Sequence, residues 1–290
     1  MKFVSYNIQY GTGKDDKVNI PRIAGEIGDA DVIALQEVER FNSTTGMTDQ
    51  VAELAALFPE HYWTYGPGVD LDASYRDDTG MLFNRRRQFG NMLLSKTPIL
   101  SSRNHLLPKF GLVTQLALQR SIVEGVIDCE LGLIRIYSVH LGHASALERE
   151  HQIETLLTIL RDAPDQGGPW SGRHVSRHWT TDFPDPPPMP RPAIFMGDFN
   201  LAPDFPEYEL LVGKLDPKYG RVTLQSGLVD AWIACGHPSD VKDGLTCDST
   251  RIDYAFLTAG LADHLKSMTV GTGAQGSDHQ PIYFELSPSG

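Results

Sequence analysis

Two polar residues follow directly after an apolar run in the last third of the chain. Asp198 and Asn200 stand two residues apart, after the letters AIFM. Side chains at positions i and i+2 of a strand point to the same face of the sheet, so an extended chain would aim both at one place. A carboxylate can hold a hard cation or position water, and an amide can hold the oxygens of an anion. The pair therefore predicts a polar site at the end of a buried strand.

Other apolar runs also end or begin with polar residues of these kinds. They are Asn7, Glu37, His140, Asp253, Asp278 and His279. If the strands lie side by side, their ends converge at one edge of the sheet and gather four carboxylates, two histidines and two amides, Asp198 and Asn200 included. Such a cluster would repel itself without a cation.

A hard divalent cation would balance these carboxylates. Mg²⁺ prefers oxygen ligands and leaves coordination sites for water and for substrate phosphate. Glu37 is the best single candidate ligand, and a merely solvated glutamate at a strand end is an equal alternative. Asp278 and His279 open a strand with no packing reason, so the imidazole could polarise a phosphoryl oxygen or move a proton, oriented by Asp253.

Zinc is a weaker alternative to magnesium. His140 and His143 have H-x-x-H spacing, but one such pair at a strand end is little evidence for a zinc site. The cysteines, Cys129, Cys235 and Cys247, are odd in number and form no C-x-x-C, which favours free thiols over a disulfide scaffold or a thiolate zinc site.

Hydrophobic periodicity indicates the elements that must position these residues. Strands are expected over 2–8, 31–38, 121–128, 133–141, 193–200, 251–258 and 281–286. Strand-like pieces at 61–66 and 90–95 flank a polar loop around 70–80. Helices are expected over 20–27, 51–58 and 145–161, and a helical or irregular patch over 204–214. This alternation, with antiparallel-looking pairs, implies an α/β protein with mixed sheets.

Composition limits the organisation and the partners of the chain. No composition break divides the 290 residues, so one domain over 1–290 is expected, with a Pro/Gly-rich insertion at 163–192. A surface loop is the favoured interpretation of this insertion, and a lid or docking loop is the alternative.

The net charge of −12 argues against broad nonspecific DNA binding. No apolar run approaches about 18 residues and no signal peptide is seen, which makes a cytoplasmic location the expectation.

Seven short motifs occur in order over almost the whole chain: SYNIQY, LQEV, GNMLLSKTPI, SVHLGH, MGDFN, RIDYAF and SDHQPI. Together they resemble the endonuclease/exonuclease/phosphatase superfamily, the metal-dependent relatives of pancreatic-type deoxyribonuclease, abasic-site endonucleases, neutral sphingomyelinases and inositol 5-phosphatases. The resemblance implies a four-layer α/β/β/α sandwich of two packed mixed β-sheets. It is specific for the superfamily and poorly specific for the substrate.

The resemblance also implies roles at the metal and the water. Glu37 matches the principal metal-binding glutamate, with Asn7 beside it as a substrate-binding residue. Asp278 matches an acid near or on the metal. Asp198 matches the aspartate that orients or deprotonates the attacking water, and Asn200 matches the amide that holds the phosphate or its transition state.

Further implied roles concern the phosphate and the leaving group. His279, oriented by Asp253, matches the histidine that contacts the scissile phosphate. His140 matches a second histidine that helps to protonate the leaving group, and Arg120 matches a phosphate-binding arginine. Where pancreatic-type nucleases carry a glutamate partner for the second histidine, this chain offers amides, and Asn91 is assigned to substrate binding.

These observations predict a Mg²⁺-dependent phosphoesterase, with Mn²⁺ as a substitute, that hydrolyses a small-molecule or lipid-type phosphodiester. The stretch LTCDSTRIDY lacks the tryptophan of the lipid 5-phosphatase motif, and the basic loops of abasic-site enzymes are not evident. A DNA or RNA nuclease is the alternative enzyme, for which the run Arg85–Arg87 could contact a backbone. A catalytically silent phosphate-binding scaffold is the alternative of another class. The oligomeric state is left open.

Overall fold

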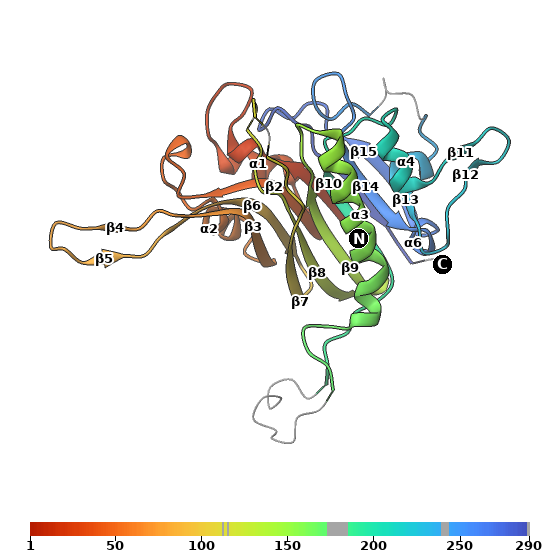
Figure 1. Ribbon diagram of the computed structural model, residues 1–290, viewed down its shortest axis with the longest axis horizontal. Helices are drawn as coiled ribbons and strands as arrows, with labels where there is room; N and C mark the ends of the chain where they lie inside the picture. The colour runs from red at the N-terminus through yellow and green to blue at the C-terminus, as the bar shows by residue number, and fades with distance from the viewer. Residues whose placement is uncertain (112, 115, 173–184, 239–243, 289–290) are drawn as a thin grey trace.

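Two six-stranded mixed sheets lie face to face in the computed structural model, and helices cover their outer faces (Figure 1). The structure describes residues 1–111, 113–114, 116–172, 185–238 and 244–288. In spatial order the first sheet holds β15 (Leu265–Val270), β16 (Ile282–Leu286), β1 (Lys2–Asn7), β2 (Val32–Arg40), β6 (Arg86–Ser95) and β3 (Tyr62–Asp72). The second holds β13 (Leu228–Asp230), β14 (Asp253–Thr258), β10 (Ala193–Asp198), β9 (Gly132–His140), β8 (Ser121–Cys129) and β7 (Ile99–Leu106).

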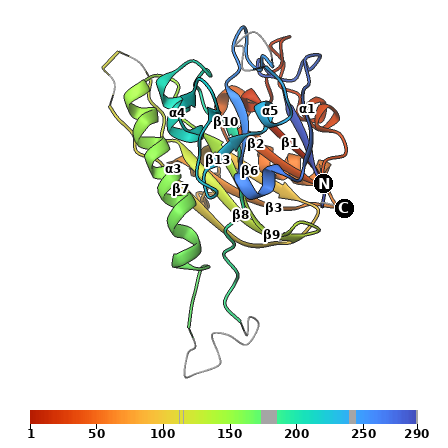
Figure 2. The same ribbon diagram turned by 90° about the vertical axis from the view of Figure 1, so that its right-hand side faces the viewer.

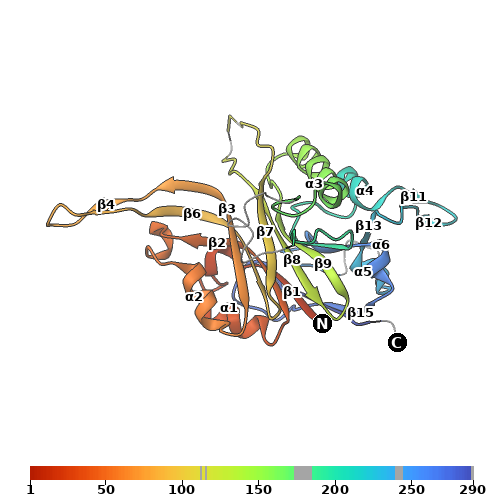
Figure 3. The same cartoon turned by 90° about the horizontal axis from the view of Figure 1, so that it is seen from below.

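The helices complete a four-layer sandwich. Seen from below in Figure 3, α1 (Ile20–Ile27) and α2 (Gln50–Leu57) lie on the first sheet, and α3 (Ala146–Gln166) and α4 (Pro206–Val212) lie on the second. Short helices α5 (Ala231–Ala234) and α6 (Ala259–Ala262) and two-stranded ribbons β4 (Tyr75–Arg76) with β5 (Leu82–Phe83) and β11 (Leu215–Asp216) with β12 (Gly220–Arg221) fill the connections. The predicted α/β/β/α sandwich is therefore confirmed.

Three apolar clusters hold the four layers together. Phe3 of β1 packs between the sheets, whereas Val4 and Tyr6 of the same strand pack toward α1 and α2. Leu156 of α3 and Leu211 of α4 join the cluster on the outer face of the second sheet. Because the central strands are buried on both faces, they read as the near-continuous apolar runs seen in the sequence.

The two parallel strand pairs explain why the polar residues meet. β1 runs parallel to β2, and β9 runs parallel to β10. Parallel neighbours end at the same edge of a sheet, and β1 ends at Asn7, β9 at His140 and β10 at Asp198. Within the second sheet, Asp198 stands opposite His140 on one side and opposite Asp253 on the other. The expected convergence of strand ends is thus observed.

Several elements are missing from the sequence prediction or differ from it in extent. The sequence does not predict β7 and β15, which are edge strands whose exposed positions weaken the hydrophobic signal. β3 continues into the expected polar loop as far as Asp72 and pairs with β6, and the two strands form a long hairpin that projects from the sandwich, tipped by β4 and β5 (Figure 1). α3 continues past the expected end at 161 to Gln166, with Pro164 in its last turn. β10 ends at Asp198, two residues before the expected end of the strand.

The described flanks of the 163–192 segment lie far from the polar strand ends. They leave the C-terminus of α3 and enter the first residue of β10, at the edge of the sheets opposite to Asp198 (Figure 2). Residues 173–184 of this segment lie outside the described residues. Among the described residues, no helix is long and apolar enough to cross a membrane.

Truncation of Leu156 tests the packing of α3 on the second sheet. Leu156 is fully buried, so we expect Leu156→Ala to lower the free energy of unfolding by about 3 kcal/mol. Leu147→Ala is the matched control, because Leu147 lies on the same helix and is 56% exposed. Equal shifts of the two variants in urea unfolding would contradict the assigned packing.

Candidate active site

A cavity of about 330 Å³ lies at the edge where the polar strand ends meet. Seven of the ten predicted site residues line it: Glu37, Arg120, His140, Asp198, Asn200, Asp278 and His279. Asn7 and Asp253 lie directly behind the lining, hydrogen-bonded to Asp198 and His279. Residues from both ends of the chain and from both sheets therefore form one site.

Asp198 is the buried centre of this site, 1% exposed. Its Oδ2 accepts hydrogen bonds from the side chains of Asn7 (2.9 Å) and Asn200 (3.2 Å). The Nε2 atoms of His140 and His279 lie 3.3 and 3.8 Å from the same oxygen. Burial raises the pKa of Asp198 above its usual range, and the cationic His279 opposes that rise. The carboxylate is poised to hold water or a cation.

The pairing of Asp198 with Asn200 is made by a turn rather than by a strand face. The strand ends at Asp198, and Oδ1 of this residue accepts a hydrogen bond from the Asn200 backbone N–H at 2.9 Å. This i to i+2 bond is an Asx-type turn, and Asn200 sits in it with φ of 52°. Asp198 and Asn200 therefore do not share one face of a strand, as the sequence spacing predicts, although both side chains reach one cavity.

Gly197 is required for this turn. Its φ is +151°, and a Cβ at this position would lie 2.0 Å from the carbonyl oxygen of Val139 on β9. Only a residue without a side chain lets β10 approach β9 this closely just before Asp198.

His279 is a cationic group held by a buried acid. Its Nδ1 lies 2.8 Å from Oδ2 of Asp253, which is itself buried. Burial alone would lower the pKa of His279, but the Asp253 carboxylate, Cys247 and the Asp198 carboxylate together outweigh it and raise the pKa well above its usual range. Nε2 of His279 lies 3.8 Å from Oδ2 of Asp198 and 3.4 Å from the amide nitrogen of Asn7. The Nε2 atom therefore lies on the cavity side of the ring, opposite to the nitrogen that Asp253 holds.

A β-bulge turns Glu37 into the site. Gln36 and Glu37 of β2 together stand opposite the single residue Asn91 of β6, and Glu37 has φ of 61°. Its Oε1 lies 3.8 Å from Nε2 of His140. Burial raises the pKa of Glu37, and the Arg120 cation opposes that rise. This geometry distinguishes Glu37 from a solvated glutamate at a sheet edge.

Arg120 is buried beside the cavity and contacts two histidines. One guanidinium nitrogen lies 3.1 Å from Nδ1 of His140, and another lies 3.0 Å from Nδ1 of His143. The guanidinium also lies over the ring of Phe89, 5.9 Å from its centroid. Burial lowers the pKa of His140 well below its usual range, and the Arg120 cation lowers it further.

Two predicted residues lie apart from the centre of the site. Asn91 does not line the cavity, because its amide donates to the carbonyls of Ser121 (2.7 Å) and Ser138 (3.2 Å) between the sheets. Asp278 lines the cavity but is exposed at its rim, where Gln9 Nε2 donates to it at 2.9 Å.

The cavity is also lined by Gln9, Tyr10 and His143, which are not among the ten site residues predicted from the sequence. Gln9 and Tyr10 have φ of 44° and 45° in the turn after β1, so they join Glu37 and Asn200 among strained residues at the cavity. Strained backbone concentrates at functional sites. No sequence pattern indicates positive φ at a non-glycine residue, so Gln9 and Tyr10 could not be predicted as site residues. His143 was visible in the sequence only as part of the H-x-x-H spacing.

The donor atoms of the cavity fit a hard divalent cation. The cavity is lined by three carboxylates, those of Glu37, Asp198 and Asp278. Behind them, Oδ1 of Asp253 is buried without a hydrogen-bond partner. Oxygen donors of this kind suit Mg²⁺ or Mn²⁺. Because the Nδ1 atoms of both H-x-x-H histidines contact Arg120, this pair is poorly placed to act as a zinc pair.

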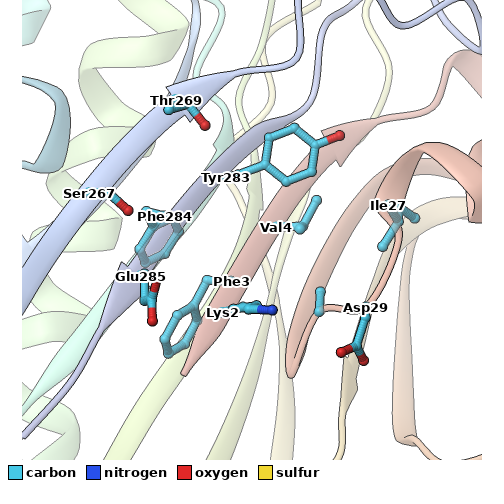
Figure 4. Close-up of a pocket in the computed structure, with 11 residues that line it drawn as sticks. Lys2, Phe3, Val4, Ile27, Asp29, Ser267, Thr269, Tyr283, Phe284 and Glu285 are labelled. Carbon is cyan, nitrogen blue, oxygen red and sulfur yellow. The ribbon is translucent and has the colours of Figure 1, made fainter.

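A second cavity, of about 190 Å³, lies at the amino end of β1 (Figure 4). Val4, Tyr283 and Phe284 contribute to its wall, and Lys2 and Asp29 lie at its margin. Among the described residues, the groups of three metal-ligating side chains all include His279 and lie at the first cavity instead. The candidate catalytic side chains are therefore concentrated at the edge of the sheets where β1, β9 and β10 end.

Comparisons with known proteins agree with this geometry. A family model described as "Endonuclease/Exonuclease/phosphatase family" matches residues 4–279. None of the curated proteins matches the sequence significantly.

Solved structures show the same fold at low sequence identity. An endonuclease/exonuclease/phosphatase from Beutenbergia cavernae is 19% identical with a TM-score of 0.65, covering 100% of this chain and 72% of that one. A mannosyl-6-phosphatase from Bacteroides thetaiotaomicron is 18% identical with a TM-score of 0.62, covering 99% and 100%. A Neisseria 3′ phosphatase bound to product DNA hairpin is 16% identical with a TM-score of 0.59, covering 99% and 100%.

Substitution of Gly197 tests the turn that places Asp198. A Cβ would meet the Val139 carbonyl, so we expect Gly197→Ala to lower the free energy of unfolding by about 2 kcal/mol or more. Gly260→Ala is the control, because a Cβ there meets no atom within 4 Å. Thermal unfolding of both variants measures the difference, and a neutral Gly197→Ala would contradict the close approach.

Proposed function

The chain belongs to the Endonuclease/Exonuclease/phosphatase family, whose members are hydrolases acting on phosphate esters, and we propose that it hydrolyses a phosphodiester with a divalent cation, Mg²⁺ or Mn²⁺. The observation that carries this proposal is the meeting of Glu37, Asp198 and cationic His279 in one cavity. Glu37 and Asp278 would hold the cation. When bound, the cation offsets negative charge on the phosphate and on the leaving oxygen.

Asp198 positions the attacking water in this proposal. Its carboxylate is fixed by the amides of Asn7 and Asn200, so it cannot rotate away from the cavity. A fixed acceptor can hold a water molecule in line with the bond to be broken. The raised pKa of Asp198 makes its carboxylate a stronger base toward that water.

His279 and His140 supply donors to the phosphate. The His279 imidazolium, held by Asp253, and the Asn200 amide stabilise charge that builds on the nonbridging oxygens. His140 accepts from Arg120 at Nδ1, so its proton lies on Nε2, the atom that faces Asp198. His140 therefore acts as a neutral donor near the leaving oxygen. This assignment differs from the protonating role that the sequence resemblance implies.

The charges around the cavity favour a diester over a monoester. Among the described residues, the carboxylates of Glu37, Asp198, Asp253 and Asp278 outnumber the cationic groups, Arg120 and His279, and no lysine lines the cavity. One divalent cation brings this set close to neutrality. A phosphodiester adds a single negative charge, whereas a monoester near neutral pH adds almost two.

A phosphomonoesterase is the second candidate. Two proteins of the same fold are described as a mannosyl-6-phosphatase and a 3′ phosphatase.

The nuclease and the silent scaffold have less support. For a nuclease, the run Arg85–Arg87 gives little support, because Arg86 pairs with Asp70 at 2.8 Å and Arg85 lies over the ring of Tyr75. A silent scaffold would have lost motif residues, and every motif position here holds a chemically competent side chain.

Removal of either central side chain should lower the turnover number strongly without unfolding the protein. We expect Asp198→Ala and His279→Ala each to lower kcat by about 100-fold or more, because one preorganised contact to a developing charge is worth roughly 3 kcal/mol. Asp128→Ala, at an exposed position of β8, should keep wild-type activity. A folded Asp198→Ala protein with full activity would refute the assignment.

A substrate panel separates the candidate functions. The panel holds bis(p-nitrophenyl) phosphate, p-nitrophenyl phosphate, sphingomyelin and phosphatidylinositol vesicles, sugar phosphates, and supercoiled and single-stranded DNA. We expect hydrolysis of diesters that needs Mg²⁺ or Mn²⁺ and stops with EDTA. Faster hydrolysis of monoesters would make the chain a phosphatase, and plasmid nicking would make it a nuclease. Metal binding without any turnover would favour the scaffold.

A further inference from the structure

The exposed histidine His143 is held in a fixed position at the cavity wall, although the proposed hydrolysis does not use it. Its backbone carbonyl and that of Gly142 accept hydrogen bonds from Arg149, at 3.3 and 3.2 Å. Arg149 is buried and pairs with Glu207 at 2.9 Å. The backbone N–H of Gly142 donates to Oε1 of Gln152 at 2.7 Å. Helix α3 thus anchors the turn that carries His143 to the cavity wall.

Gly142 also fits this anchored turn tightly. A Cβ at this position would lie 2.4 Å from Oε1 of Glu148, so α3 packs directly against the backbone of the turn. Glu148 is itself buried and accepts from the Phe110 backbone N–H at 2.7 Å. A solvated surface histidine would not need this support.

Arg120 determines which ring nitrogen of each histidine carries the proton. A guanidinium has only donors, so Nδ1 of His140 and Nδ1 of His143 must both accept. A neutral imidazole that accepts at Nδ1 carries its hydrogen on Nε2. One buried guanidinium therefore fixes two imidazoles as N–H donors, one at Asp198 and one on the exposed wall of the cavity.

We propose that Arg120 is a positioning residue that clamps His140 and His143 as Nε2–H donors, and that His143 is a further substrate contact. The part about substrate rests on the proposed function. Two of the five N–H donors of Arg120 are directed at Nδ1 of the two rings, so its role in this arrangement is to orient them. His143 instead donates from the rim to an oxygen of the ester group that projects out of the cavity.

The tautomers can be read without any assay of activity. A long-range ¹H–¹⁵N correlation spectrum of ¹⁵N-histidine-labelled protein distinguishes Nε2–H from Nδ1–H and from imidazolium. We expect Nε2–H signals for His140 and His143, assigned by their loss in single His→Gln variants, and we expect Arg120→Met to disturb both. Arg161→Met, at an exposed site on α3, is the control. Nδ1–H or imidazolium signals in the wild-type protein would overturn the clamp, even if Arg120→Met did not fold.

The substrate contact is tested by three histidine variants on the best substrate of the panel. We expect His143→Ala to lower kcat/KM about tenfold, the value of one lost hydrogen bond. His143→Gln should recover most of this loss, because its terminal amide places an N–H near the position of Nε2. His151→Ala is the matched control, since His151 pairs with Glu154 on α3 and does not line the cavity.

The outcomes separate this proposal from the proposed function. Equal activity of His143→Ala and His151→Ala would overturn the substrate contact. Equal losses in His143→Ala and His143→Gln would make the role of His143 structural and would also overturn it. A wild-type protein that hydrolyses no phosphoester would refute the proposed function, and the spectrum would still decide on the clamp.

Discussion

Burial of the Asp198 carboxylate is the constraint on which the rest of the site depends. A buried anion is costly unless donors surround it, and this one is surrounded by Asn7 from the first sheet, by Asn200 from its own turn and by two histidines. The histidines need partners in turn, which are Asp253 and Arg120. Because Asn7 comes from the first sheet whereas His140 and Asp253 come from the second, the electrostatics of the cavity depend on how the two sheets pack.

Much of this arrangement could be predicted from the sequence. Buried strands produce apolar runs, and a polar residue at the end of such a run has no place in a core, so Asn7, His140 and Asp198 were visible as a set. The edge strands β7 and β15 escaped prediction, because each exposes many of its residues and carries a weak hydrophobic signal. Asn91 was predicted at the site as an amide, and only the register of β6 places that amide between the sheets.

What the sequence could not indicate is the backbone that aims the side chains. The bulge at Glu37, the turn at Asn200 and the conformations of Gln9 and Tyr10 all use positive φ at residues with side chains. Propensity gives no warning of such conformations, because tertiary contacts impose them. Gly197 is the exception, since a glycine directly before an acidic residue at a strand end is visible in the letters.

The place of β1 between β2 and β16 has a consequence for biosynthesis. β2 follows β1 within a few dozen residues, but the other neighbour, β16, begins only at Ile282. One edge of β1 stays unpaired until β16 has been synthesised, and an open apolar edge can pair with wrong partners. Asn7 likewise cannot contact His279 until that residue has been synthesised. The nascent chain therefore cannot complete its site before His279 and β16 have left the ribosome, so the site forms only when the first sheet closes.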